Sequence, residues 1–294
     1  MRSKLTDPVY GLLLVLPAFL IVVGILFLPT VYTVGLSLSN FSFIKGAARS
    51  FVGLANYLSI FANGEFRSSL VNTLFFTGVT VVIELALGML LALILNRSFP
   101  MLGLLRTTIL FPWALPTALN AIVWRWLFNP DFGLFNGIFV SLGFSSVKID
   151  WLGGIPLSMY SMMTVAIWKT SSFMALILLT GLQTIPGDLY EAADIDGAAF
   201  WYKLRRITLP LLVPSILLAL LFRSMDAFRA FELPFALTDG GPAGSTQTLS
   251  LFGYRQFFQF LKFDTGSAVS VVQFLIIMAL GLLYMRLFRA RSDE

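Results

Sequence analysis

Six long apolar segments constrain the fold of this chain more than any other feature. Runs of about 20 apolar residues, the length with which an α-helix crosses a bilayer, lie near residues 11–37, 68–95, 104–128, 157–182, 207–230 and 267–290. With 57% hydrophobic and only 12% charged residues among 294, the composition excludes an ordinary water-soluble domain. The sequence therefore predicts an all-α membrane protein with six transmembrane helices in a single transmembrane domain, residues 1–294.

The basic residues between these segments predict the orientation of the chain. Six crossings place both termini on one side, and the larger group of Lys and Arg residues falls on that side: Arg2, Lys4, Arg97, Arg106, Lys203, Arg205, Arg206, Arg286, Arg289 and Arg291. Positive charge is enriched in cytoplasmic loops. We therefore expect a multi-pass protein of the cell (inner or plasma) membrane with both termini in the cytoplasm. The basic residues responsible for the net charge of +5 lie mostly at the ends of the apolar segments, so nucleic acid is not an expected partner.

Two residue types are missing, and their absence narrows the chemistry. The chain has no Cys and no His, which excludes disulfides, thiolate or imidazole metal ligands and Cys- or His-based nucleophilic catalysis. The phosphate-binding pattern GxxxxGK[ST] is also absent from the sequence. We therefore expect a non-enzymatic chain that holds no cofactor and no metal.

A charged stretch, "EAADIDGAAFWYKLRRITLP", interrupts the apolar pattern at residues 191–210. Asp188 and Glu191 are spaced as in a capping box, and Gly197 is placed as a C-terminal breaker, so the pattern predicts a short helix there. A second short helix is expected next, with Lys203 near the membrane boundary. The residues alone leave two interpretations open: a solvated loop whose charges satisfy topology, or a compact knob that docks a partner.

The same stretch carries a resemblance to a known family. Its residues reproduce the EAA---G---------I-LP signature of permease subunits in binding-protein-dependent ABC importers, at the same spacing. The resemblance implies a type I importer architecture in which the loop 187–206 is a coupling helix pair seated in a separate ATPase subunit. The implied ATPase-coupling residues are Glu191, Ala192, Ala193, Asp194 and Gly197. Glu191 would supply the charged contact, the two alanines a close approach, and Gly197 the bend.

Two further segments are similar to the sugar-importing branch of that family, the maltose, trehalose and glycerol-3-phosphate permeases. They are "FVGLANY" at residues 51–57 and "DAFRAFELPFALTDGGPAGSTQTL" at residues 226–249. The resemblance implies a di- or oligosaccharide or a glycoside such as an α-glucoside as substrate, with glycerol-3-phosphate or another polyol as the alternative. It also implies a second homologous permease subunit in a heterodimer, two copies of an ATPase subunit that bind ATP and Mg²⁺, and an extracytoplasmic sugar-binding protein.

Ionisable side chains inside the apolar segments are candidate site residues, because each costs on the order of 2.5–3.5 kcal/mol at bilayer depth on insertion scales. They are Glu84, Arg125, Lys169, Arg223 and Asp226. In the maltose permease branch, the fourth and fifth helices supply substrate contacts. By that resemblance, the expected substrate path in this chain comprises Lys169, Thr170, Phe173, Arg223, Asp226 and Ala230.

Structural explanations of these charges remain open. Arg223 and Asp226 are three residues apart and have the spacing of an intrahelical ion pair, while Lys169 at a helix end has the option of snorkelling outward. Intramembrane charges usually pair, so Glu84 and Arg125 are expected to be structural partners or inter-subunit contacts. For Arg229 and Glu232 the expectation is a surface ion pair.

Two other classes of function compete with the permease interpretation. A secondary transporter would couple transport to protons or sodium through Glu84 or Asp226 and would work without an ATPase. A membrane-embedded enzyme such as a lipid-linked glycosyltransferase needs clustered carboxylates at an interface. The acidic cluster around Glu191 is already explained by the permease signature, which leaves the enzyme without candidate residues.

Overall fold

The structure is a computed structural model that describes residues 7–41, 49–97, 100–144 and 147–292. The chain divides into two compact units, Met1–Asn63 with Gly253–Phe274, and Gly64–Phe252 with Leu275–Glu294. Within the described residues, five helices are long and apolar enough to cross a membrane, and a sharply bent helix pair makes a sixth span if the two count as one. The predicted all-α membrane fold is confirmed.

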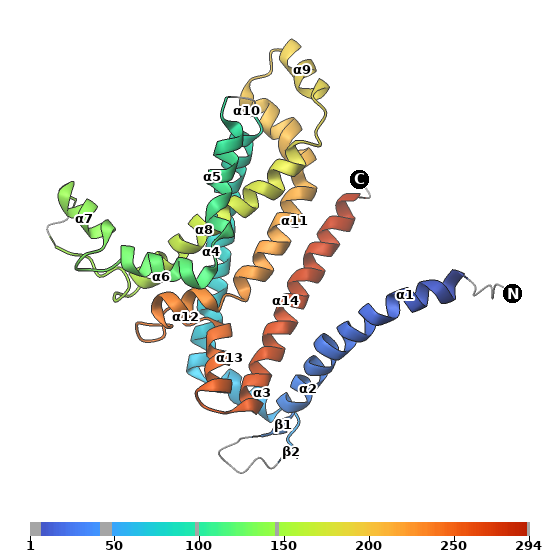
Figure 1. The fold of residues 1–294 in the computed structure, drawn as a ribbon, viewed down its shortest axis with the longest axis vertical. Helices are drawn as coiled ribbons and strands as arrows, with labels where there is room; N and C mark the ends of the chain where they lie inside the picture. The colour runs from blue at the N-terminus through green and yellow to red at the C-terminus, as the bar shows by residue number, and fades with distance from the viewer. Residues whose placement is uncertain (1–6, 42–48, 98–99, 145–146, 293–294) are drawn as a thin grey trace. The chain divides into compact units, whose positions relative to one another are not determined.

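The first unit contains the first span, a small hairpin and the helices beside it (Figure 1). Its elements are α1 (Asp7–Val22), a π-helix (Val23–Phe27), α2 (Leu28–Ser37), β1 (Ser39–Asn40), β2 (Ser50–Phe51), α3 (Ala55–Ala62), the end of α13 (Leu249–Phe258) and the beginning of α14 (Phe263–Ser292). The two strands pair antiparallel, with Ser39 opposite Phe51. The Asn56 side chain donates hydrogen bonds to the carbonyls of Ser37 at 2.8 Å and Ser39 at 2.9 Å, which ties α3 to the hairpin.

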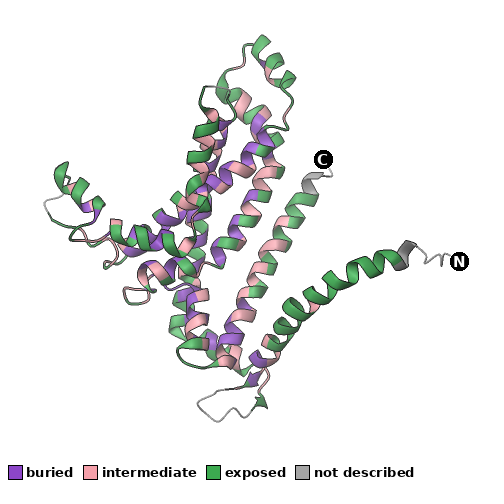
Figure 2. Ribbon diagram, viewed as in Figure 1, coloured by how far each residue is buried: buried purple, intermediate pink, exposed green. Residues whose placement is uncertain are grey.

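The second unit contains the remaining spans and the loop with the permease signature. Its elements are α4 (Gly64–Leu95), α5 (Leu102–Ala114), α6 (Thr117–Leu127), α7 (Leu134–Ser141), α8 (Leu157–Leu182), α9 (Asp188–Ile195), α10 (Phe200–Lys203), a π-helix (Leu204–Thr208), α11 (Leu209–Phe228), α12 (Glu232–Thr238), the start of α13 and the end of α14. Helix α8 packs against α4, α5, α11 and α12, and Figure 2 shows buried residues along most of its length.

Small residues let the packed helices of this unit approach closely. A Cβ atom added at Gly88 of α4 would lie 2.5 Å from the Met174 Cβ and 3.0 Å from the Ala175 backbone nitrogen on α8. A Cβ atom at Gly181 of α8 would collide with Ser215 on α11. Glycine at these positions therefore sets the spacing of the three helices, as small residues do at helix contacts within membranes.

The third predicted span is not one helix, so the continuous helix expected at 104–128 is wrong. The chain bends by 94° between α5 and α6. The break falls where Leu115 takes an extended conformation (φ −70°, ψ 135°) before Pro116. A residue that precedes proline is pushed out of the α region by a clash with the proline ring, and this explains the position of the bend.

The fifth predicted span, expected at 207–230, begins earlier than the sequence analysis placed it. Helix α10 continues through the π-helix into α11, so residues Phe200–Phe228 form one span. The separate second short helix expected in the coupling loop is therefore wrong. The backbone stays helical after Ala199, and Pro210 lies just after the π-helix, so the departure from regular α-helical bonding falls where the proline lacks its N–H.

Candidate functional site

The loop with the permease signature folds as a short helix, α9, but its N-terminus is not capped as predicted. Gly187 is the N-cap, with helical dihedrals (φ −61°, ψ −36°), and no side chain caps the helix. Asp188 is already inside the first turn, so the capping box expected between Asp188 and Glu191 is wrong. Both acids remain favourable in that turn because the N-terminus of a helix carries partial positive charge.

The C-terminus of α9 is the sharp stop that Gly197 was expected to provide. Gly197 has a positive φ of 71°. Its N–H bonds to the Asp194 carbonyl at 3.1 Å, and the N–H of Ala198 bonds to the Ala193 carbonyl at 2.9 Å. This pair of bonds is a Schellman motif, in which glycine adopts the left-handed conformation at low cost. The prediction for Gly197 as a helix breaker is confirmed.

Two side-chain contacts fasten α9 to the helix that follows it. Lys203 Nζ lies 2.5 Å from Asp194 Oδ1, and the hydroxyls of Tyr190 and Thr208 are 2.9 Å apart. One contact reaches α10 and the other reaches the π-helix, so α9 is held against the base of the long span at two points.

The outward surface of α9 contains three of the five predicted ATPase-coupling residues and one residue that the sequence analysis missed. Glu191, Ala192 and Asp194 are exposed, whereas Ala193 is buried against the chain. Ile195 is 88% exposed, an unusual position for a large aliphatic side chain at the end of a charged helix. An isolated isoleucine among acids in a short helix was the available signal for a docking residue.

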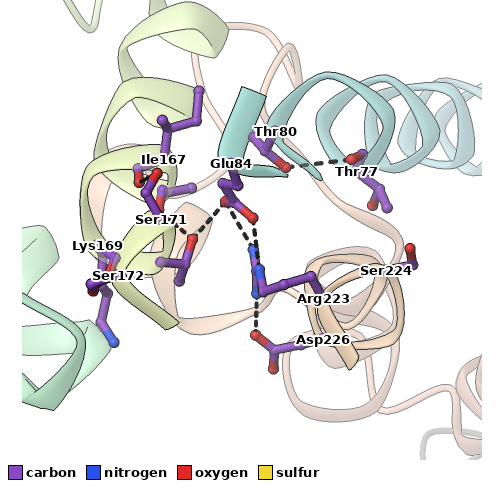
Figure 3. Close-up of polar contacts among 12 residues, drawn as sticks. Thr77, Thr80, Glu84, Ile167, Lys169, Ser171, Ser172, Arg223, Ser224 and Asp226 are labelled. Carbon is purple, nitrogen blue, oxygen red and sulfur yellow. Dashed lines mark hydrogen bonds and ion pairs between the residues drawn. The ribbon is translucent and has the colours of Figure 1, made fainter. Parts of the chain in front are cut away.

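A second polar cluster lies between the spans and joins three helices (Figure 3). Arg223 on α11 donates from Nε to Glu84 Oε2 at 2.7 Å and from Nη2 to Glu84 Oε1 at 3.0 Å, which is a bidentate pair with α4. Its Nη1 donates to Asp226 Oδ2 at 2.5 Å. The side chains of Arg223 and Glu84 are 4% and 0% exposed, whereas Asp226 is 63% exposed. Paired charges satisfy one another in this way where water is excluded.

Helix α8 contributes to the same cluster from the opposite side. The Thr170 hydroxyl donates to Glu84 Oε1 at 2.5 Å. Lys169 Nζ donates to the Trp113 carbonyl at 3.3 Å. The Phe173 ring stacks on Trp113 with centroids 5.4 Å apart. Glu84 thereby receives hydrogen bonds from two helices and connects α4, α8 and α11.

A cavity of about 300 Å³ opens beside this cluster. Five of the six predicted path residues line it: Lys169, Thr170, Arg223, Asp226 and Ala230. Phe173 does not line it but packs against Trp113, which does. Several lining residues were missed by the sequence analysis: Phe76, Trp113, Thr117, Phe231 and Glu232. Trp113 and Thr117 lie on either side of the bend at Pro116. This proline was the sequence signal from which their place beside a bend could be predicted.

The structural explanations kept open for the charged residues have different outcomes. The ion pair between Arg223 and Asp226 is present, and Glu84 is a structural partner as expected. Arg125 is exposed on α6, and it has no ion pair within the described part of the chain. Arg229 lies 3.9 Å from Asp226 rather than pairing with Glu232, because α11 ends at Phe228 and the intervening backbone is not helical.

Comparison with known proteins identifies the family to which this chain belongs. Residues 84–293 match the family model described as the inner membrane component of binding-protein-dependent transport systems. The chain belongs to this family. The match includes the α9 loop, the Glu84 cluster and every residue of the cavity lining except Phe76. The interpretation of the chain as a multi-pass membrane permease subunit is confirmed.

Named relatives of this inner membrane component extend over nearly its whole length. It is 40% identical to the trehalose/maltose transport system permease protein MalF of Thermococcus litoralis, covering 99% of this chain and 98% of that protein. It is 38% identical to the sulfoquinovosyl glycerol transport system permease protein SmoG of Agrobacterium fabrum, covering 98% and 93%. It is 34% identical to the trehalose transport system permease protein SugA of Mycobacterium tuberculosis, covering 99% and 92%.

Solved structures share the fold of this inner membrane component. A chain of a bacterial ABC transporter involved in the import of the acidic polysaccharide alginate superposes with a TM-score of 0.82 at 22% identity, covering 96% of this chain and 95% of that one. A second structure of a bacterial alginate transporter, in complex with a pentasaccharide-bound periplasmic protein, also gives 0.82. The expected importer permease architecture is therefore confirmed at the level of the fold.

Proposed function

We propose that this chain is one of two permease subunits of an ATP-driven importer for a sugar, either a di- or oligosaccharide or a glycoside such as an α-glucoside. The observation that carries the proposal is the cavity between the spans, where the predicted residues of α8 and α11 meet. Relatives whose names include trehalose, maltose and sulfoquinovosyl glycerol support a glycoside as substrate.

The chemistry of the cavity suits a polyhydroxylated molecule. Asp226 exposes most of its carboxylate, and it provides an acceptor for paired hydroxyls. Lys169 provides a donor on the opposite wall, and Trp113 and Phe231 provide aromatic surface for the C–H faces of a sugar ring. Sites for small ligands combine apolar walls with a few convergent polar groups in this manner.

Helix α9 is proposed as the coupling helix that docks on a separate ATPase subunit. It exposes Glu191 with the apolar Ile195 four residues further along the same face, and partner contacts commonly combine a buried apolar anchor with charges around it. ATP and Mg²⁺ would be bound by two copies of that subunit, with the chain's termini on the same cytoplasmic side. An extracytoplasmic binding protein delivers the sugar, and the second permease subunit is a homologous, different chain.

Alternating access requires that α9 contact the two nucleotide states of the ATPase differently, since equal contacts would give nucleotide no influence on the spans. ATP closes the ATPase dimer and turns the cavity outward, and hydrolysis returns it. Because α9 is tied to the long span through Lys203 and Thr208, a displacement at the ATPase reaches α11 directly.

The test is sugar-dependent ATPase activity of the complete transporter in lipid, with its binding protein and a panel of neutral sugars, glycosides and glycerol-3-phosphate. The native complex is expected to be stimulated by a sugar, and Glu191→Ala and Ile195→Ser are expected to lose most of that stimulation while the complex still assembles. Asp188→Ala is the matched control, since it removes an exposed acid from the same helix.

Three outcomes would contradict the proposal. Stimulation by glycerol-3-phosphate alone would assign the chain to the polyol alternative. Uptake that persists after deletion of the ATPase and follows an ion gradient would make it a secondary transporter. Equal loss of stimulation in Asp188→Ala and Glu191→Ala would remove the specific role assigned to Glu191.

A further inference from the structure

We infer that Glu84 is a positioning residue that sets the charge selectivity of the cavity: it cancels the charge of Arg223, so that the site accepts an uncharged sugar and disfavours an anionic one. This inference rests on the proposed function and narrows its substrate class. It depends on where the charges around the cavity are held and on which of them are already paired.

The hydrogen bonds of Arg223 show why its donors are not available to an anionic ligand. Two of its three nitrogens face Glu84 and the third faces Asp226, so the planar donor edge that would grip a phosphate, sulfonate or carboxylate is already occupied by two carboxylates. Arginine binds anions best through such a bidentate edge. With a side chain only 4% exposed, Arg223 has no freedom to turn another edge toward a ligand.

The charges at the cavity balance when Glu84 is included. Three cations line it, Lys169, Arg223 and Arg229. Two carboxylates line it as well, Asp226 and Glu232. Glu84, bound to the back of Arg223, supplies the third negative charge. Without Glu84 the cavity would carry one net positive charge and would attract an anion.

Thr170 keeps Glu84 in the orientation that this balance requires. Its hydroxyl donates to Oε1, the same oxygen that accepts from Arg223 Nη2. The carboxylate of Glu84 is therefore fixed by α8 as well as by α11, and it stays aligned with the guanidinium rather than turning away. Fixed partners of this kind determine the orientation of the groups that contact a ligand.

Glu84 and Asp226 both accept from Arg223, and they have different roles in binding. Glu84 is fully buried and neutralises Arg223, whereas Asp226 accepts from the same arginine through Oδ2 and lies exposed at the cavity, with Oδ1 3.9 Å from Arg229. A neutral sugar finds an oriented acceptor for its hydroxyls there. An anionic sugar meets the Asp226 carboxylate, while the donors of Arg223 are already taken by carboxylates, and like charges in proximity disfavour binding.

The experiment compares trehalose with its mono-uronic acid, two radiolabelled ligands that differ by a single carboxylate. Equilibrium binding is measured on the complete transporter complex in nanodiscs at millimolar ligand, without the binding protein, so that the preference of the binding protein does not enter. The native complex is expected to bind trehalose more tightly. Glu84→Gln, which keeps the shape but removes the charge, is expected to shift the ratio of affinities toward the uronic acid by about tenfold.

Two further variants keep the inference falsifiable if Glu84→Gln does not assemble. Glu232→Gln removes the same charge from an exposed position of the cavity wall and is expected to shift the ratio in the same direction, by less. Glu65→Gln removes a charge from the first turn of α4, outside the cavity lining, and is expected to leave the ratio unchanged.

A native complex that binds the two ligands equally, or neither of them, overturns the inference. An unchanged ratio in Glu84→Gln does the same, because a residue with only a structural role lowers both affinities together. If Glu84→Gln does not assemble, an unchanged ratio in Glu232→Gln overturns the inference. Failure of the proposed function is seen separately, as absence of sugar-stimulated ATPase activity in the native complex supplied with its binding protein.

Discussion

Two ion-paired clusters in the second unit place charges of the same kind in opposite surroundings. Glu84 and Arg223 are buried where three spans meet, whereas Asp194 and Lys203 pair at the surface of the α9 loop. The buried charges have little access to water, so each depends on its protein partners. The surface pair keeps its hydration and contributes little to stability. The comparison separates a part of the molecule that must stay assembled from one that is available for a partner.

The largest effect is expected from Glu84→Ala, which leaves the Arg223 charge buried without its main partner. Loss of one member of a buried pair typically costs about 3–5 kcal/mol of unfolding free energy. Denaturant unfolding in micelles measures this cost. The double variant Glu84→Ala with Arg223→Ala is expected to be more stable than Glu84→Ala alone. A double variant less stable than both single ones would show that the pair is not coupled.

The next effect tests the packing that surrounds the buried cluster. Gly88→Ala places a Cβ against Met174 and Ala175, and we expect a loss of about 1–3 kcal/mol in unfolding free energy from overpacking. Gly78→Ala is the matched control on the same helix, since its Cβ meets nothing within 4 Å. The midpoints of thermal unfolding of the two variants measure this loss of stability. Equal midpoints would contradict the close approach of α4 and α8.

A smaller effect is expected in the loop, where only backbone conformation is at stake. Gly197→Ala places a side chain at a φ of 71°, where a left-handed conformation costs about 1–2 kcal/mol. Gly187→Ala, at a helical φ of −61°, is the control and is expected to be neutral or slightly stabilising. Limited proteolysis of the α9 loop reports the change, and an equal cleavage rate in both variants would exclude strain at Gly197.

The smallest effect is expected for the surface pair itself. A double-mutant cycle of Asp194→Ala and Lys203→Ala should give a coupling energy of about 1 kcal/mol or less, because exposed ion pairs are screened by water and salt. The side chains are 62% and 21% exposed, respectively. A coupling as large as that between Glu84 and Arg223 would contradict the distinction between the two clusters.

The sequence predicted the parts of the fold that depend on local pattern. Five spans follow from apolar length alone, and the stop at Gly197 follows from glycine in a helix terminus. The bend at Pro116 was equally local, since proline restricts the residue before it. It was missed because apolar length was given more weight than the proline, and the lining residues Trp113 and Thr117 were missed with it.

The candidate site was predicted by residue type but not by pairing. An arginine inside a span must have a partner, yet Glu84 lies 139 residues from Arg223 in the sequence. Arg223 forms its bidentate pair with Glu84 rather than with its sequence neighbour Asp226, and this depends on how α4 packs on α11. The burial of Ala193 likewise depends on how α9 folds back, which no local pattern specifies.

The helical span that runs from α10 through the π-helix into α11 joins the α9 loop to the buried cluster. Thr208, one of its two attachments to α9, lies fifteen residues before Arg223, or about 22 Å along a helix that rises about 1.5 Å per residue. The contact of Ser215 with Gly181 lies between these two points and has no spare volume. The attachment to α9 and the arginine at the cavity wall are therefore parts of one helical span that is held against α8 midway.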